Sequence, residues 1–105
     1  MLGDLEQLVL LAVIRTGDEA YGVRIGEEIA RYGGRDLTFA TIHKALERLE
    51  TKGHVRSHLG DPTPVRGGRA KRYFEVTAQG RRVLKQELAI IRQMAAGLQL
   101  GWDPP

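Results

Sequence analysis

The sequence of 105 residues contains no cysteine. This absence excludes disulfide bonds, catalysis by a thiol and zinc sites with cysteine ligands, and it agrees with a reducing compartment. We therefore expect the protein to be cytoplasmic. Long hydrophobic runs are also missing: the longest, residues 8–14, is too short to span a bilayer, and Asp4 and Glu6 precede it where a signal peptide carries positive charge. We expect a buried helix there and no membrane partner.

Side chains that commonly build catalytic or metal sites are few. The histidines are His43, His54 and His58, and the last two lie on one face of an expected strand, about 13 Å apart at about 3.3 Å per residue, too far for one zinc ion. Ser57 is the only serine, and neither a glycine-rich phosphate loop nor a carboxylate pair in a known motif is present. We expect no enzyme activity, no metal site and no cofactor.

Length and composition are those of one globular domain. The hydrophobic fraction of 42% and the charged fraction of 28% are ordinary. Sixteen Lys and Arg against thirteen Asp and Glu give a net charge of +3, which permits nucleic-acid binding without proving it. The position of the charges is therefore more informative than their sum.

Helical periodicity predicts three helices in the first half of the chain. Residues 4–16 are apolar nearly all round, which indicates a heavily buried helix. A second periodic stretch, residues 21–32, ends at two glycines. Thr38 is a good N-cap for a third helix, which Gly53 closes.

After Gly53 the pattern changes to period two. Residues 54–59 predict a half-buried strand with Val55 and Leu59 on its apolar side, and a second strand follows at residues 71–76. The segment between them is rich in proline and glycine and predicts a long loop. The two strands therefore form a hairpin.

The last periodic stretch begins after Thr77, a good N-cap, and predicts a helix to about Leu98. Its apolar residues alternate steps of four and three, as in a coiled-coil seam. Three helices, a hairpin and a further helix give a mainly α fold with a small β-hairpin, the winged helix-turn-helix. We assign residues 1–76 to this DNA-binding domain, 77–100 to a C-terminal dimerisation helix and 101–105 to a flexible tail.

The third helix carries the first set of candidate DNA-binding residues. In helix-turn-helix folds the second helix of the pair enters the major groove and its N-terminal residues contact base edges. Hydroxyls, an imidazole and cations are suited to that contact. The candidates are Thr38, Phe39, Thr41, His43, Lys44 and Arg48. Taken alone, this pattern is more typical of a cap followed by a solvated helix face.

The hairpin tip carries the second set. Four cations and no carboxylate lie in residues 66–72, and two glycines among them let the backbone approach phosphates or a minor groove. The candidates are Arg66, Arg69, Lys71 and Arg72. A solvated run of charge is the alternative, and the position directly after a helix-turn-helix favours a DNA-binding wing.

The apolar stripe of the last helix is broad enough that a monomer would leave one side exposed. We therefore expect a homodimer, which matches a two-fold DNA operator. The expected contacts are Leu84, Leu88, Ile91, Met94, Ala95 and Leu98. A helix packed only on its own core is the alternative. Met94, Leu98 and Trp102 are candidates for a small-molecule effector site between the subunits, although Trp102 can equally anchor the tail.

Four blocks extend in order over nearly the whole chain: LEQLVLLAVI from residue 5, AYGVRI from 20, IHKALERLETKGHV from 42 and RGGRAKRYFEVTAQG from 66. Together they resemble the PadR-like transcriptional regulators, and the single C-terminal helix is similar to the short subgroup. The resemblance implies a winged-helix dimer, usually a repressor, joined through the C-terminal helix and the first helix. It also implies that some members bind aromatic or drug-like effectors.

One pair departs from the family pattern, because Ile42 and His43 stand where a Leu-Tyr pair is common. No contact made through that tyrosine is implied for this chain. The function we predict is sequence-specific binding of double-stranded DNA by a homodimeric repressor, with release by a small effector as an option. The alternative is a winged-helix protein-interaction module, because one fold serves both purposes.

Overall fold

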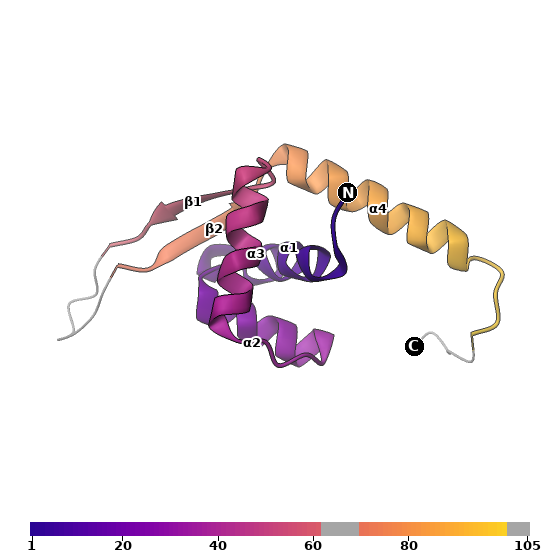
Figure 1. Cartoon of the computed structure of the whole chain (residues 1–105), viewed down its shortest axis with the longest axis horizontal. Coiled ribbons are helices and arrows are strands. Elements are labelled where there is room, and N and C mark those ends of the chain that lie inside the picture. Colours follow the sequence, from indigo (N-terminus) through magenta and orange to yellow (C-terminus); the bar gives the residue numbers. More distant parts are fainter. Residues whose placement is uncertain (62–69, 101–105) are drawn as a thin grey trace.

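The computed structural model describes residues 1–61 and 70–100 of the chain. The elements follow one another as α1 (Asp4–Thr16), a short 3-10 turn η1 (Gly17–Glu19), α2 (Gly22–Gly33), α3 (Phe39–Thr51), β1 (Val55–Leu59), β2 (Arg72–Val76) and α4 (Ala78–Ala95). The strands pair antiparallel, with Val55 opposite Val76. The order confirms the predicted winged helix-turn-helix with an additional C-terminal helix. In Figure 1 the hairpin and α4 extend from opposite sides of the body formed by α1, α2 and α3.

The core lies between the first three helices and the start of the hairpin. α1 contacts α2, α3, β2 and α4, which explains why it is apolar nearly all round. The largest fully buried side chains are Leu10, Ile25, Ile42, Leu46, Leu49, Val9 and Val55. Each contributes roughly 1.5–3 kcal/mol through burial. This core holds α2 and α3 in a fixed relation to each other.

Two threonine caps fix where α3 and α4 begin, as predicted. The hydroxyl oxygen of Thr38 accepts a hydrogen bond from the Thr41 amide at 3.2 Å, and that of Thr77 accepts one from the Gly80 amide at 3.0 Å. Such caps contribute about 1 kcal/mol each. The Thr77 hydroxyl also donates to the Gly53 carbonyl at 2.7 Å, so the start of α4 is tied to the turn that follows α3.

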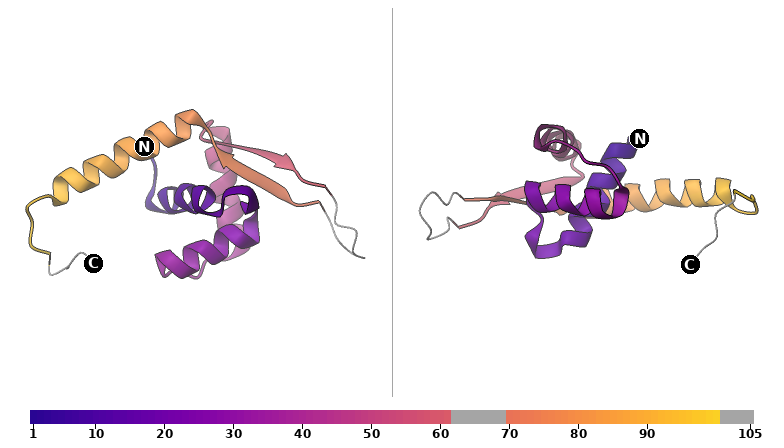
Figure 2. Two further views of the ribbon diagram at one scale, coloured as in Figure 1. Left: turned by 180° about the vertical axis from the view of Figure 1, so that it is seen from behind. Right: turned by 90° about the horizontal axis from the view of Figure 1, so that it is seen from below.

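The structure corrects two details of the predicted elements. α4 ends at Ala95 instead of about Leu98, because Ala96 is extended (ψ 134°) and Gly97 adopts a left-handed conformation (φ 78°). Leu59 was expected on the buried side of its strand, but it is 61% exposed. The hairpin extends away from the helical body, as the views in Figure 2 show, so no helix covers its far end. Within residues 1–61 and 70–100, no helix is both long and apolar enough to cross a membrane.

Candidate nucleic-acid interface

The first turns of α3 present five of the predicted DNA-binding residues on a surface beside the base of the hairpin. Phe39, His43 and Lys44 are exposed, as is the cap residue Thr38, while Thr41 is half-buried. The two threonine hydroxyl groups lie 2.9 Å apart and share a hydrogen bond. Both hydroxyls are therefore partly used at the start of the helix.

Phe39 and His43 form a stacked pair one helical turn apart. Their ring centroids are 5.8 Å apart and the planes differ by 13°. The Nε2 atom of His43 lies 2.8 Å from a carboxylate oxygen of Glu47 on the next turn. One edge of the Phe39 ring packs against Gly22, where a Cβ atom would overlap the ring. The aromatic side chain is thus held in one orientation although it is 61% exposed.

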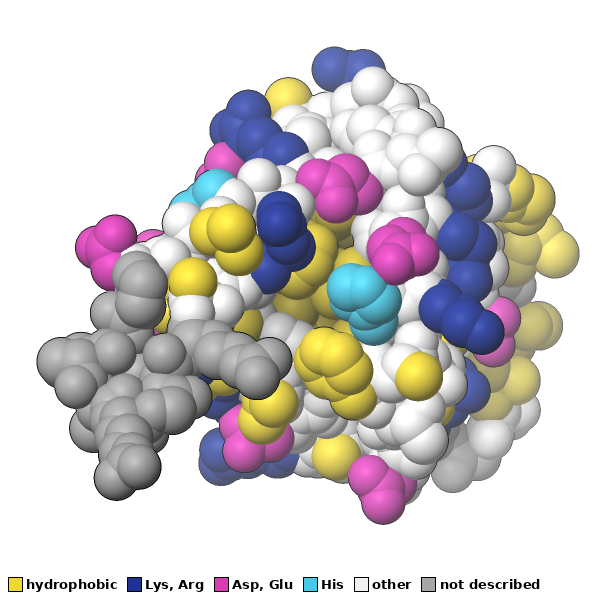
Figure 3. All heavy atoms as spheres, turned by 60° about the vertical axis from the view of Figure 1, so that its left-hand side comes forward, with side chains coloured by type: hydrophobic (Ala, Val, Ile, Leu, Met, Phe, Trp, Pro, Cys, Tyr) yellow, Lys and Arg dark blue, Asp and Glu magenta, His cyan; other side chains and the backbone are white. Residues whose placement is uncertain are grey.

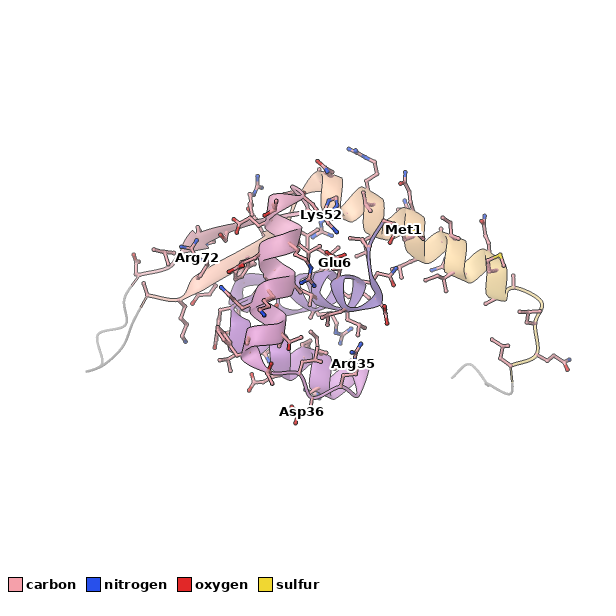
Figure 4. The ribbon with its side chains drawn as sticks, viewed as in Figure 1. Met1, Glu6, Arg35, Asp36, Lys52 and Arg72 are labelled. Carbon is pink, nitrogen blue, oxygen red and sulfur yellow. The ribbon has the colours of Figure 1, made fainter. Side chains whose placement is uncertain are left out.

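The second half of α3 is anchored to α1 through Glu6. The Glu6 side chain is only 7% exposed, and its carboxylate lies 3.0 Å from Lys52 Nζ and 3.8 Å from Arg48 Nε. It also accepts a hydrogen bond from the Gly3 amide at 3.0 Å. Figure 4 shows Glu6 and Lys52 lying toward each other between the two helices. Arg48, predicted to bind DNA, therefore has an acidic partner within its own chain.

Glu6 makes stability depend on pH in the acidic range. Burial raises the pKa of Glu6, but the Gly3 amide and the cations Lys52 and Arg48 outweigh it, so the pKa is lowered in the folded protein. The stabilisation is therefore present above about pH 4.5 and is lost as the pH falls through the lowered value. We expect Glu6→Gln to reduce the free energy of unfolding by about 1–2 kcal/mol at pH 7 and to make that free energy fall less steeply as the pH is lowered in the acidic range. Urea titrations between pH 3 and 7 measure this.

The control for that experiment is Glu19→Gln, which removes an exposed carboxylate whose only ion pair among the described residues is a 3.6 Å contact with Arg24. Exposed pairs of this kind contribute at most about 1 kcal/mol, so its stability should follow that of the unmodified protein. If the free energy of unfolding of Glu6→Gln fell as steeply at acidic pH as that of the unmodified protein, the role given to Glu6 would be contradicted.

The first half of β2 and the residue before it are fixed to the start of α2. The Tyr21 and Tyr73 rings meet edge to face at 5.6 Å, and the Phe74 amide donates to the Ala20 carbonyl at 2.8 Å. Lys71 Nζ lies 4.3 Å from the centre of the Tyr21 ring. These contacts place the first residues of β2 beside the N-terminal end of α2.

Arg72 is positioned by a short hydrogen-bond chain from α3. Its guanidinium donates to Ser57 Oγ at 3.0 Å, and the serine hydroxyl donates to a carboxylate oxygen of Glu50 at 2.8 Å. Arg72 remains exposed and lies at the outer end of β2, as Figure 4 shows. Two other predicted wing residues, Arg66 and Arg69, lie outside the described residues.

A hollow of about 310 Å³ lies between the starts of α2 and α3 and the first half of β2. Aromatic and aliphatic side chains form much of its wall and the two wing cations form part of it; the lining includes Phe39, His43, Leu46, Lys71, Arg72 and Phe74. Figure 3 shows this part of the molecule, with hydrophobic side chains and a histidine in the middle of the face and both basic and acidic side chains around them. The arrangement combines fixed apolar groups with cations at the edge.

A second candidate surface lies on α4. Leu84 is 4% exposed and Leu88 is half-buried, because this part of the helix packs on α1. Further along, exposure rises to 54% at Ile91 and 75% at Met94. Leu98, which follows the helix, is 61% exposed. Of the predicted dimer contacts, Leu84 and Leu88 thus pack within the chain, Ala95 is half-buried, and Ile91, Met94 and Leu98 are exposed. Trp102 lies outside the described residues.

Sequence reasoning missed the groups that tie these surfaces together. The Glu87 carboxylate on α4 accepts hydrogen bonds from the Leu2 amide at 2.8 Å and from the Gln7 side chain at 3.2 Å. The sequence signal that could have indicated Glu6 and Glu87 is the position of each acidic residue within an otherwise apolar helical stretch. Within the described part of the chain, no cluster of three or more His, Cys, Asp or Glu side chains could hold a metal ion.

Comparison with known proteins gives a family and several structural relatives. The sequence profile of the transcriptional regulator PadR-like family matches residues 10–86. The chain is similar to the solved structure of a transcriptional regulator from Clostridium thermocellum, with 24% identity and a TM-score of 0.71 over 87% of this chain and 85% of that one. It is also similar to a PadR family transcription regulator from Clostridium difficile, with 24% identity and a TM-score of 0.70 over 89% and 95%.

A third relative is a PadR family transcriptional regulator from Eggerthella lenta, with 25% identity and a TM-score of 0.69 over 90% of this chain and 81% of that one. The comparison with curated proteins found no significant match. The structural relatives share the winged helix with an added C-terminal helix, which agrees with the fold described above.

Proposed function

Because the chain belongs to the PadR-like family of transcriptional regulators, we propose that it binds double-stranded DNA sequence-specifically as a homodimer. It is a regulator and not an enzyme. In this proposal the dimer acts in the cytoplasm as a repressor, by occupying promoter DNA at a two-fold operator. In it, residues 1–76 form the DNA-binding domain and residues 77–100 the dimerisation segment.

The observation that carries DNA binding is the position of the cations at the edge of one surface. Lys44 on α3, Arg72 on β2 and Lys71 directly before β2 are exposed. None of the three has a carboxylate partner within 4.0 Å among residues 1–61 and 70–100. Such cations release counterions when they approach phosphates, which is the main source of affinity for DNA. In the proposed complex α3 enters the major groove and the outer part of the wing lies over the adjacent backbone.

The exposed half of α4 supports the dimer. Ile90, Ile91 and Met94 are more than half exposed on a helix that projects beyond the body of the subunit. A second copy of α4 would cover these side chains, and large exposed apolar patches are uncommon in monomers. Two copies of α3 would then be held at a fixed separation, as a two-fold operator requires.

The crevice between two such helices is also where we place a small aromatic or drug-like effector. Met94 and Leu98 supply adaptable apolar walls from each subunit, and Trp102 follows them in the sequence. Binding there would change the separation of the two α3 helices and release the operator.

The proposal is tested by selection from a pool of randomised DNA duplexes, followed by nuclease protection of the recovered sequence and a salt titration. A two-fold protected site and an affinity that falls steeply with salt are expected. A well-folded protein that recovers no duplex would overturn the proposal and would favour the protein-interaction module.

Arg72 should contribute to affinity without contributing to sequence preference. We expect Arg72→Ala to weaken binding to all duplexes and to lower the slope of log affinity against log salt by about one for each phosphate that the arginine neutralises. Arg31→Ala is the matched control, because it removes the same charge from the end of α2 that points away from the hairpin in Figure 1. Equal slopes for both variants and the unmodified protein would contradict the assignment of the wing.

A further inference from the structure

The polar groups at the start of α3 are largely bonded within the protein. The hydroxyl groups of Thr38 and Thr41 bond to each other, and the Thr38 oxygen also caps the helix. His43 is 2.8 Å from Glu47 and stacks on a neighbouring ring. Part of the hydrogen-bonding capacity of these side chains is therefore already used before any base edge approaches.

The same stretch has one side chain that can bind a base through paired hydrogen bonds, Lys44, whose partner would be guanine. Residues 38–47 contain no Arg, Asn or Gln, which are the usual bidentate partners of guanine and adenine. Besides the polar side chains of Thr38, His43, Lys44 and Glu47, this stretch exposes two apolar groups, the Phe39 ring and the Ala40 methyl group. Apolar contact is therefore available as a source of sequence preference at this position.

Phe39 is fixed in the way that a recognition group must be. Gly22 on α2 lies against one part of the ring, and the parallel His43 ring covers another. The side chain is nevertheless 61% exposed. Because both neighbours hold the ring before any ligand arrives, little conformational entropy is lost when it makes a contact. The ring is therefore a rigid apolar group at the end of the helix that leads into the groove.

The apolar group that the major groove of unmodified DNA offers is the C5-methyl group of thymine. We propose that Phe39, with Ala40 beside it, determines specificity by contacting a thymine C5-methyl group in each half-site. This inference rests on the proposed DNA-binding function. It identifies what the start of α3 recognises, while the cations of α3 and the wing supply affinity without regard to sequence.

The test uses the duplex recovered by selection, with thymines of the half-sites replaced one position at a time by deoxyuridine. This replacement removes the methyl group and keeps base pairing. At one position, the unmodified protein should bind about fourfold more weakly per half-site, the factor expected for burial of one methyl group, and roughly 15-fold more weakly when both half-sites are changed. Equal affinity for the thymine duplex and every uracil duplex would overturn the inference and leave DNA binding intact.

Variants assign the effect to the residue. Phe39→Ala should lose most of the difference between the thymine and uracil duplexes, whereas Phe39→Leu, which keeps a larger apolar side chain, should retain more of it. Tyr32→Ala is the matched control, since it removes a similarly exposed ring, 58% against 61%, at the other end of α2. It should discriminate between the two duplexes as the unmodified protein does.

Discrimination that persists in Phe39→Ala, with its thermal unfolding unchanged, would overturn the role of Phe39. A failure to recover any duplex would refute the proposed function, and this inference with it.

Discussion

Gly80→Ala is expected to lower the Tm by about 10–20 °C, because a Cβ atom at this position would overlap the carbonyl oxygen of His54. It would also lie 2.9 Å from Val76 Cγ1. The obstacle is backbone, and that backbone is held in place: the His54 amide donates to the Leu49 carbonyl at 2.8 Å and its carbonyl accepts from the Thr77 amide at 3.0 Å. Overpacking of this kind costs about 2–3 kcal/mol. Thermal unfolding followed by circular dichroism measures it.

Two other glycines provide a graded control. At Gly26 a Cβ atom would lie 3.0 Å from Ile42 Cδ1, a flexible side-chain end that can move, so Gly26→Ala should be less destabilising than Gly80→Ala. At Gly33 the nearest atom is 3.6 Å away, an ordinary contact, and alanine there should be neutral or stabilise α2 by up to about 1 kcal/mol. If Gly80→Ala unfolded at the same temperature as Gly33→Ala, close packing of α4 on the α3–β1 turn would not contribute to stability.

The parts of the fold that depend on local signals could be predicted from the sequence. Apolar periodicity gave α1 its correct bounds, and the hydroxyl groups of Thr38 and Thr41 explain why α3 begins where it does. Thr77 marked the start of α4 in the same way. Each of these signals acts within one or two helical turns, so neighbouring residues are enough to specify it.

The differences arise where the outcome depends on distant residues or on a surface without cover. Leu59 has the right hydrophobicity for a buried strand face, but the hairpin carries it beyond the helices. The ion pair of Arg48 with Glu6, 3.8 Å long, could not be foreseen because the two residues lie far apart in the sequence, and Arg48 stays a predicted DNA contact. The end of α4 depends on Gly97, whose left-handed backbone overrides an apolar pattern that continues to Leu98.

The N-terminal segment connects the two candidate surfaces mechanically. Leu2 is buried and its amide binds Glu87 on α4, while Glu6, one turn later, binds Lys52 at the end of α3. α4 is thus fixed relative to α3 through α1 as well as through the turn at Gly53. In a dimer formed by α4, these contacts would set the separation of the two α3 helices.

Ile91→Asp is accordingly expected to abolish dimerisation and to weaken binding to the two-fold operator by about 100-fold or more. Ile91 is 54% exposed on the uncovered half of α4, where a carboxylate in the proposed interface would be buried without a partner. The decrease in DNA affinity follows because two linked half-site contacts bind about 10²–10⁴-fold more tightly than a single one. Sedimentation equilibrium and DNA titration at the same protein concentration measure the two effects.

Gln93→Asp is the matched control, since it introduces the same carboxylate at an exposed polar position on the opposite face of the helix. It should remain dimeric and bind the operator as before. A dimeric Ile91→Asp protein would place the subunit contact elsewhere on the molecule. A monomeric Ile91→Asp protein with undiminished operator affinity would mean that one subunit recognises the whole site, and the contacts that fix α4 relative to α3 would then serve stability alone.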